Sequence, residues 1–255
     1  AILGSALFGA FWGVIPGYLQ AKRGSHIVIT TIMFNFIASS IIIWLLAGML
    51  MAPNQMSPET VSFADGVILF KIHDILNSMG FSVARSPLNI SFALALLCCF
   101  AVWVLIWRTR LGYRIRATGF STKASTYAGY RPEWIIILVM AISGGLAGMM
   151  AVNEILGVQH RVILNFTSGY GFTGIAVALM GRNHPVGIIF ASLLFGALYQ
   201  GGAELDFEFQ TITRDMVVMI QGLIILFSGA LAYMFNPILE RFFSANTPQK
   251  EMLDG

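Results

Sequence analysis

The residues best suited to bind a metal or to act as nucleophiles are few, and their spacing supports neither activity. No serine has a nearby histidine base, and no H-E-x-x-H motif occurs. Cys98 and Cys99 are adjacent in an apolar run, and we interpret them as small apolar fillers. The histidines are scattered over different loops, without the spacing of metal ligands: His26, His73, His160 and His184. The sequence therefore predicts no enzyme, no metal site and no cofactor.

One stretch imitates a nucleotide-binding motif. Residues 169–174 read G-x-G-x-x-G, the pattern of dinucleotide-binding loops. That fingerprint requires a preceding strand and an acidic residue about 20 positions further on. Here a loop precedes the glycines and an apolar stretch falls at that distance, so we reject the motif. A G-x-x-x-x-G-K-[ST] loop is also missing, so ATP would have to be bound by a partner.

Composition explains why catalytic groups are scarce. Of 255 residues, 57% are hydrophobic and 11% are charged, against about 25% charged in a soluble domain. The mean hydropathy is +0.78. Such a chain is expected to lie in a membrane. Its net charge of +3 is too small to indicate a nucleic-acid partner.

Long apolar runs predict an all-α bundle of membrane-spanning helices, since about 20 apolar residues cross a bilayer. Five runs reach that length: 1–19, 27–51, 88–107, 134–156 and 216–235. Their interiors hold no Lys, Arg, Asp or Glu, apart from Glu154 at the very end of its run. Proton-coupled carriers use ionisable groups inside the membrane. The pattern therefore argues against proton coupling.

A sixth apolar region is interrupted. Residues 172–180 and 186–201 are separated by a break at 181–185 that contains Gly, Asn and Pro. Neither piece is a comfortable crossing alone. We expect either a discontinuous helix or a re-entrant half-helix followed by a short span, which the membrane tolerates only where the backbone is buried or lines a cavity.

The distribution of Lys and Arg predicts the orientation, because cytoplasmic loops carry an excess of them. Ten basic residues are expected inside: Lys22, Arg23, Arg108, Arg110, Arg114, Arg116, Lys123, Arg131, Arg241 and Lys250. This makes 108–133 a long cytoplasmic loop, keeps the C-terminus cytoplasmic and leaves 52–87 as an extracytoplasmic loop. The acids Glu204, Asp206, Glu208 and Asp215 then lie outside.

Polar and small residues within the spans have two possible roles. Asn35, Ser143 and Gln221 could bond a neighbouring helix or line a passage for a polar solute. Glycines four apart, at 9, 13 and 17 and at 144 and 148, predict flat strips for close helix packing or for sliding. The chain begins with Ala1 inside an apolar run, which we interpret as a truncation that has removed upstream spans.

The loop at 108–133 contains a short helix of its own. Ser121 or Thr122 can cap it, its small-residue face is Ala124, Ala128 and Gly129, and Pro132 stops it before the next span. A capped helix with small residues and an exposed tyrosine, Tyr127, is typical of a docking element for a soluble partner. A merely solvated basic loop would not need it.

Three segments carry a resemblance to a known family. The loop "RTRLGYRIRATGFSTKASTYAGYRP" resembles the cytoplasmic coupling loop of permease subunits of ABC importers, of the ribose and branched-chain amino acid type. Ser125 stands where that family commonly has Ala, and Tyr130 where Ile is common. The run "GYGFTGIAVALMGRNHPVGIIFASLLFGALYQGG" is more specifically similar to the nucleoside and simple-sugar subfamily. So is "IPGYLQAKRGSHIVITTIMFNFIA", although Ser25 and His26 replace its usual Asn-Glu.

The resemblance implies a bacterial inner-membrane permease that imports nucleosides or simple sugars. Its implied partners are an ABC ATPase, a second permease subunit and a substrate-binding lipoprotein. ATPase coupling would involve Gly119, Thr122, Ala124, Tyr127, Ala128 and Gly129. The solute passage would involve Asn35, Phe172, Asn183 and His184. Two alternatives stay open: a branched-chain amino acid permease, and a membrane scaffold that does not transport.

Overall fold

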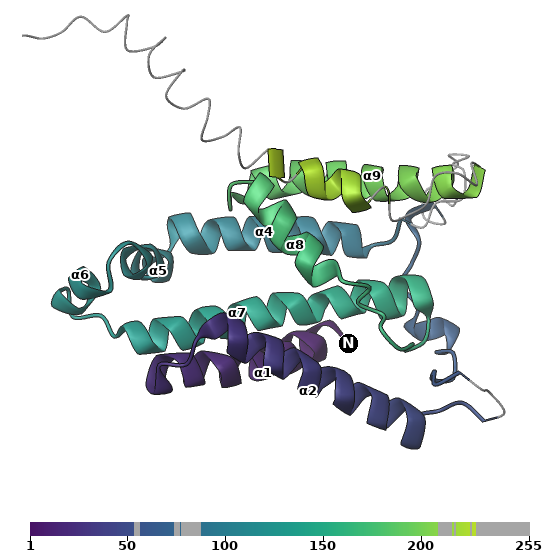
Figure 1. Cartoon of the computed structure of the whole chain (residues 1–255), viewed down its shortest axis with the longest axis horizontal. Coiled ribbons are helices and arrows are strands. Elements are labelled where there is room, and N and C mark those ends of the chain that lie inside the picture. The colour runs from purple at the N-terminus through teal and green to yellow at the C-terminus, as the bar shows by residue number, and fades with distance from the viewer. Residues whose placement is uncertain are drawn as a thin grey trace, which may run out of the picture. The chain divides into compact units, whose positions relative to one another are not determined.

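The computed structural model describes residues 1–53, 57–73, 77, 88–208, 216, 218–224 and 226–227 (Figure 1). Contacts divide the chain into two compact units, residues 1–168 and residues 169–255, and each is described by itself. Everything described is helical or loop, apart from an isolated antiparallel bridge between Lys71 and Asn89. The all-α prediction is confirmed in this part of the chain. Half of the predicted last span, 216–235, lies outside the described residues.

The first unit contains four long helices and several short ones. They are α1 (Ile2–Arg23), α2 (Ile27–Gly48), the 3-10 helix η1 (Asp65–Val67), α4 (Ser91–Arg108), α5 (Arg110–Phe120), α6 (Thr122–Tyr127), α7 (Pro132–Ala151) and the π-helix η2 (Val152–Gln159). The second contains α8 (Tyr170–Met180) and α9 (Pro185–Glu208). Within the described part of the chain, five helices are long and apolar enough to cross a membrane: α1, α2, α4, α7 with η2, and α9. The chain is thus a multi-pass membrane protein, and four of the five long runs form helices of sufficient length and apolarity to be spans.

Helices α1 and α7, far apart in sequence, lie side by side (Figure 1). Their glycines face each other. A Cβ atom on Gly13 would come within 2.6 Å of the Met140 carbonyl oxygen, and one on Gly9 would overlap the carbonyl of Gly144. Such approach is possible only without side chains. The predicted glycine strips therefore pack against each other; whether they also permit sliding stays a prediction.

The end of α7 winds differently from the rest of that helix. The eight residues that follow α7 without a break form η2, in which backbone bonds join residues five apart rather than four. The helix continues to Gln159, so Glu154 lies five residues inside its end and not at the boundary that hydropathy predicted. Glu154 is 8% exposed. The expectation of spans without a buried acid was therefore wrong at this position.

The loop that follows α2 is tied to the end of η2. The Leu69 amide donates to the Leu156 carbonyl at 3.1 Å, and the Phe63 amide to the His160 carbonyl at 2.8 Å. Glu59 pairs with Arg161 at 3.3 Å. These bonds satisfy carbonyls that a helix end leaves without a partner.

In the second unit, α8 packs against α9 through Ala176, Val177, Ala191 and Phe195. The break between the two helices is confirmed, at residues 181–184. Helix α8 has 11 residues, about 16 Å, and is too short to cross a bilayer. Helix α9 runs for 24 residues, to Glu208. The prediction that both pieces are short was wrong for α9, because the helix continues through the polar residues at which the apolar run ends.

Candidate functional site

The chain turns sharply where α4 meets α5. Thr109 caps α5, its hydroxyl accepting a bond from the Gly112 amide at 3.0 Å. Gly112 is buried against the last turn of α4, where a Cβ atom would lie 2.6 Å from the Ile106 carbonyl carbon. A glycine here lets α5 start directly beside the end of α4.

A second turn joins α5 to α6. Ser121 caps α6 and accepts a bond from the Ala124 amide at 3.2 Å, so of the two capping candidates it is Ser121 that serves. The Ser121 amide also donates to the Ala117 carbonyl at 3.1 Å, which closes α5. One residue therefore ends one helix and begins the next.

A buried pair of hydroxyl groups holds α5 against α6. We call these two helices and the cap of α6, residues 110–129, the elbow. Thr118 Oγ1 on α5 and Ser125 Oγ on α6 are 2.9 Å apart, and Ser125 is 2% exposed. Thr118 also donates to the Arg114 carbonyl at 2.8 Å, so Ser125 is the donor to Thr118. Sequence reasoning missed the pair, and treated Ser125 only as a departure from the family pattern. Two hydroxyl residues flanking a capped turn were the available signal.

Gly129 ends α6 with a left-handed backbone at φ 78°. The Tyr130 amide donates to the Ser125 carbonyl and the Gly129 amide to the Thr126 carbonyl, both at 3.0 Å. This is the Schellman pattern, which favours glycine at this position. The ring of Tyr130 lies 5.3 Å from the Arg114 guanidinium, a cation–π contact back to α5. Pro132 then opens α7.

The outer face of the elbow presents two aromatic side chains almost entirely to solvent. Tyr127 is 95% exposed and Phe120 is 91% exposed. The remaining residues predicted for coupling are exposed on the same elbow: Gly119, Thr122, Ala124, Ala128 and Gly129. Sequence reasoning missed Phe120. Its apolar ring at the end of a basic, polar helix was the available signal.

The residues predicted for a solute passage belong to different units. Asn35 is exposed on α2 in the first unit. Phe172, 73% exposed on α8, and the pair Asn183 and His184 after α8 belong to the second. His184 Nδ1 accepts a bond from the Val186 amide at 3.3 Å, which places it as a cap on the start of α9.

The turn between α8 and α9 repeats the Schellman pattern without glycine at its left-handed position. Arg182 has φ 52° and Asn183 φ 54°. The Asn183 amide donates to the Ala178 carbonyl at 2.9 Å and the Arg182 amide to the Leu179 carbonyl at 3.0 Å. Gly181 is buried against α9, where a Cβ atom would lie 2.6 Å from the Ile188 nitrogen. Close packing of the two helices therefore sets this turn.

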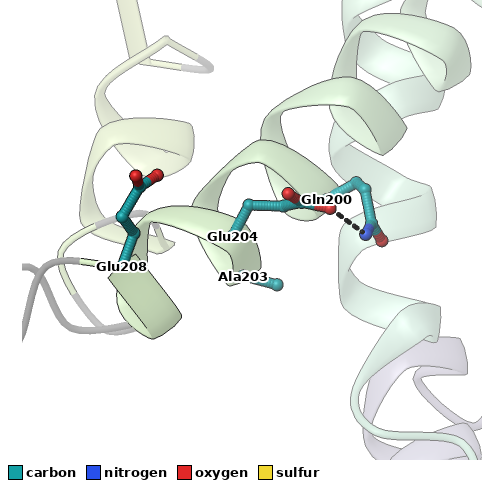
Figure 2. A pocket seen from close by; sticks show the side chains of 4 residues that line it. All are labelled: Gln200, Ala203, Glu204 and Glu208. Atoms are coloured by element: carbon teal, nitrogen blue, oxygen red, sulfur yellow. Dashed lines mark hydrogen bonds between the residues drawn. The ribbon is translucent and has the colours of Figure 1, made fainter.

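Acidic residues gather at the end of α9. Glu204 and Glu208, with Gln200 and Ala203, line a cavity of about 570 Å³ (Figure 2). Gln200 donates to Glu204 at 3.3 Å. Glu204 and Glu208 therefore lie on helix α9, which continues beyond the predicted apolar run. The Asp206 side chain and Asp215 lie outside the described residues.

Residues 1–229 match the family described as "Branched-chain amino acid transport system / permease component". The chain belongs to this family.

Three curated relatives are similar over most of the chain. The glucose ABC transporter permease protein TsgB13 of Haloferax volcanii is 30% identical over 88% of this chain and 59% of its own length. The guanosine ABC transporter permease protein NupP of Bacillus subtilis is 33% identical over 89% and 63%. The nucleoside ABC transporter permease protein NupB of Lactococcus lactis is 34% identical over 87% and 60%. The chain thus spans about three fifths of the length of these relatives. No solved structure matches it.

Proposed function

We propose that this chain is the permease subunit of an ATP-driven importer for nucleosides or simple sugars. The observation that carries the proposal is the match over residues 1–229, together with relatives named for glucose, guanosine and nucleoside transport. A branched-chain amino acid permease is the second candidate, because the family description names that solute class.

The α5–α6 elbow docks the ATPase subunit. Exposed aromatic rings are favoured at protein interfaces, since they bury a large apolar area at a small entropic cost. Phe120 and Tyr127 supply two such rings, and the elbow carries Arg and Lys with no acid. A groove with apolar pockets and an acidic rim fits this surface. Coupling runs through Gly119, Thr122, Ala124, Tyr127, Ala128 and Gly129, with the elbow on the cytoplasmic side of a bacterial inner membrane.

The elbow is rigid enough to transmit force. Its helices are held by the Thr118–Ser125 bond, and the Schellman cap leads into α7 within a few residues. A displacement of α6 by the ATPase therefore moves the start of α7. Solute passes through a second permease subunit and this one, along residues that include Asn35, Phe172, Asn183 and His184, after delivery by a substrate-binding lipoprotein to the opposite face. Helix α8 is a re-entrant half-helix in this scheme.

Uptake by cells with and without the gene tests the transport function. Radiolabelled guanosine, glucose and leucine are supplied separately. We expect uptake of guanosine or glucose to fall to background without the gene. Loss of leucine uptake alone would favour the amino acid permease, and unchanged uptake of all three would leave a scaffold as the better interpretation.

Two alanine substitutions test docking. Tyr127→Ala and Phe120→Ala are each expected to lower ATP hydrolysis by the assembled transporter about tenfold or more, since a central aromatic anchor at an interface contributes 2 kcal/mol or more. Tyr113→Ala is the control, because Tyr113 is 58% exposed on α5 but lies seven residues, about two helical turns, before Phe120. Normal ATP hydrolysis in both elbow variants would refute docking at this face.

A further inference from the structure

Glu154 is a buried acid that the proposed coupling and passage residues do not include. It lies in η2, within a membrane-spanning helix, and is 8% exposed. Ionisable groups at membrane depth are costly and usually functional. Glu154 also lies in a π-helical segment. This is a second indication that the residue is functional, because such segments are frequent at functional sites.

Few hydrogen bonds offset the cost of burying the Glu154 carboxylate. An ionised carboxylate offers about four acceptor positions on its two oxygens. Among the described residues it receives a single hydrogen bond, from Gln159 Nε2 to Oε1 at 3.3 Å, and it forms no ion pair. A nearly buried carboxylate with one long hydrogen bond has capacity for further donors.

The π-winding is what brings Gln159 to Glu154. Residues five apart align where backbone bonds join residues five apart, whereas on an α-helix the neighbours are three and four apart. The same segment turns Asn153 toward the chain just before α4, where Asn89 Nδ2 donates to Asn153 Oδ1 at 3.1 Å. Gly157 leaves room for the Asn89 amide. The helix is thereby anchored on one side while the Glu154–Gln159 pair lies on another.

We propose that Glu154 and Gln159 form a binding station for adjacent hydroxyl groups of a sugar ring. The inference rests on the proposed function, since nucleosides and simple sugars share such hydroxyls. A carboxylate accepts two hydroxyl hydrogens, and the neighbouring amide both donates and accepts, so together they fit a vicinal diol.

The position suits a station near the entrance. By the proposed orientation, this end of α7 faces the side from which solute arrives. The chain from Thr60 to Leu69 is bonded over the same end, through Val162, His160 and Leu156. Solute would reach Glu154 when this segment moves during the transport cycle.

Comparing solutes that differ only in the diol gives the test. The assembled transporter, with its ATPase and receptor, is measured with guanosine against 2′,3′-dideoxyguanosine and with glucose against 2,3-dideoxyglucose. In Glu154→Gln, we expect uptake of the diol-bearing solute to fall about tenfold, since bonds to charged groups are the strong ones, while uptake of the deoxy compound is unchanged. Because the receptor is unaltered, its own preference cancels when variants are compared.

Two further variants separate binding from a structural role. Glu154→Asp keeps the charge and is expected to retain part of the preference for the diol. Asn153→Ala loosens the same segment and should lower uptake of both members of a pair equally. An equal loss, or no loss, for both solutes in Glu154→Gln would overturn the station while the proposed function stands. If the unaltered transporter imports none of these solutes, the proposed function fails and the station fails with it.

Discussion

Two helix ends in this protein use the same hydrogen-bond pattern with different residues. Helix α6 ends at Gly129, exposed and with nothing within 4 Å of where a Cβ would be. Helix α8 ends with Arg182 and Asn183 in the left-handed region, beside a buried Gly181. The first end depends on glycine for its conformation. The second depends on glycine for packing, and tertiary contact compensates for the less favourable backbone of its neighbours.

The largest expected effect comes from removing the packing glycine. Gly181→Ala puts a methyl group 2.6 Å from the Ile188 nitrogen, so the backbone must shift. We expect the free energy of unfolding to fall by about 3 kcal/mol, measured by thermal unfolding in detergent. Gly174→Ala, within α8 and with open space around it, is the control and should be neutral or stabilising. Equal behaviour of the two would mean that packing does not set the α8–α9 turn.

Breaking the elbow bond should have the next largest effect. Thr118→Val leaves the buried Ser125 hydroxyl without a partner, which costs about 2 kcal/mol. Hydrogen exchange at the α6 amides is expected to speed up correspondingly. Adding Ser125→Ala should restore part of the loss, because neither hydroxyl is then left unpaired. Strictly additive losses would show that the two hydroxyls do not interact.

Replacing Gly129, which is needed for its backbone conformation, should have a smaller effect on stability. Gly129→Ala forces a side chain into the left-handed region, at a cost of about 1 kcal/mol. The bond from the Tyr130 amide to the Ser125 carbonyl then opens more often, and exchange at that amide should rise about fivefold. Gly119→Ala is the matched control, because Gly119 also has open space but lies within helix α5. Unchanged exchange in Gly129→Ala would show that the end of α6 does not depend on the left-handed backbone of Gly129.

The smallest effect has the opposite sign. Arg182→Gly relieves a left-handed arginine but adds unfolded-state entropy, so we expect a gain of about 0.5 kcal/mol in the free energy of unfolding. Thermal unfolding should show a slightly higher midpoint. A clear loss of stability would mean that the arginine side chain, and not the backbone, matters at this turn.

The spans were predictable because bilayer thickness sets a simple length criterion. Hydropathy placed α1, α2, α4 and α7 within a few residues. It ended α7 and α9 too early for a physical reason. Backbone bonding does not stop at a charge, so the helix formed by α7 and η2 continues to Gln159 and α9 continues through Glu204.

The candidate docking site was predictable only where its cause is local. Ser121 as a cap and a short helix ending near Gly129 follow from neighbouring residues alone. The Thr118–Ser125 bond depends on the angle between two helices, which no sequence pattern encodes. The left-handed Arg182 was equally unpredictable, because packing of α8 on α9 overrides the preference of that residue.

The glycine contact between α1 and α7 has a mechanical consequence. With the backbones of Gly9 and Gly144 touching, no layer of side chains remains between the helices to change rotamer and absorb strain. An ion pair between Lys22 and Glu133 ties their ends beside the elbow. We therefore expect α1 and α7 to move together as one rigid body. Helix α1 alone has 22 residues, about 33 Å, so a displacement at one end of this helix pair is transmitted across the thickness of a membrane.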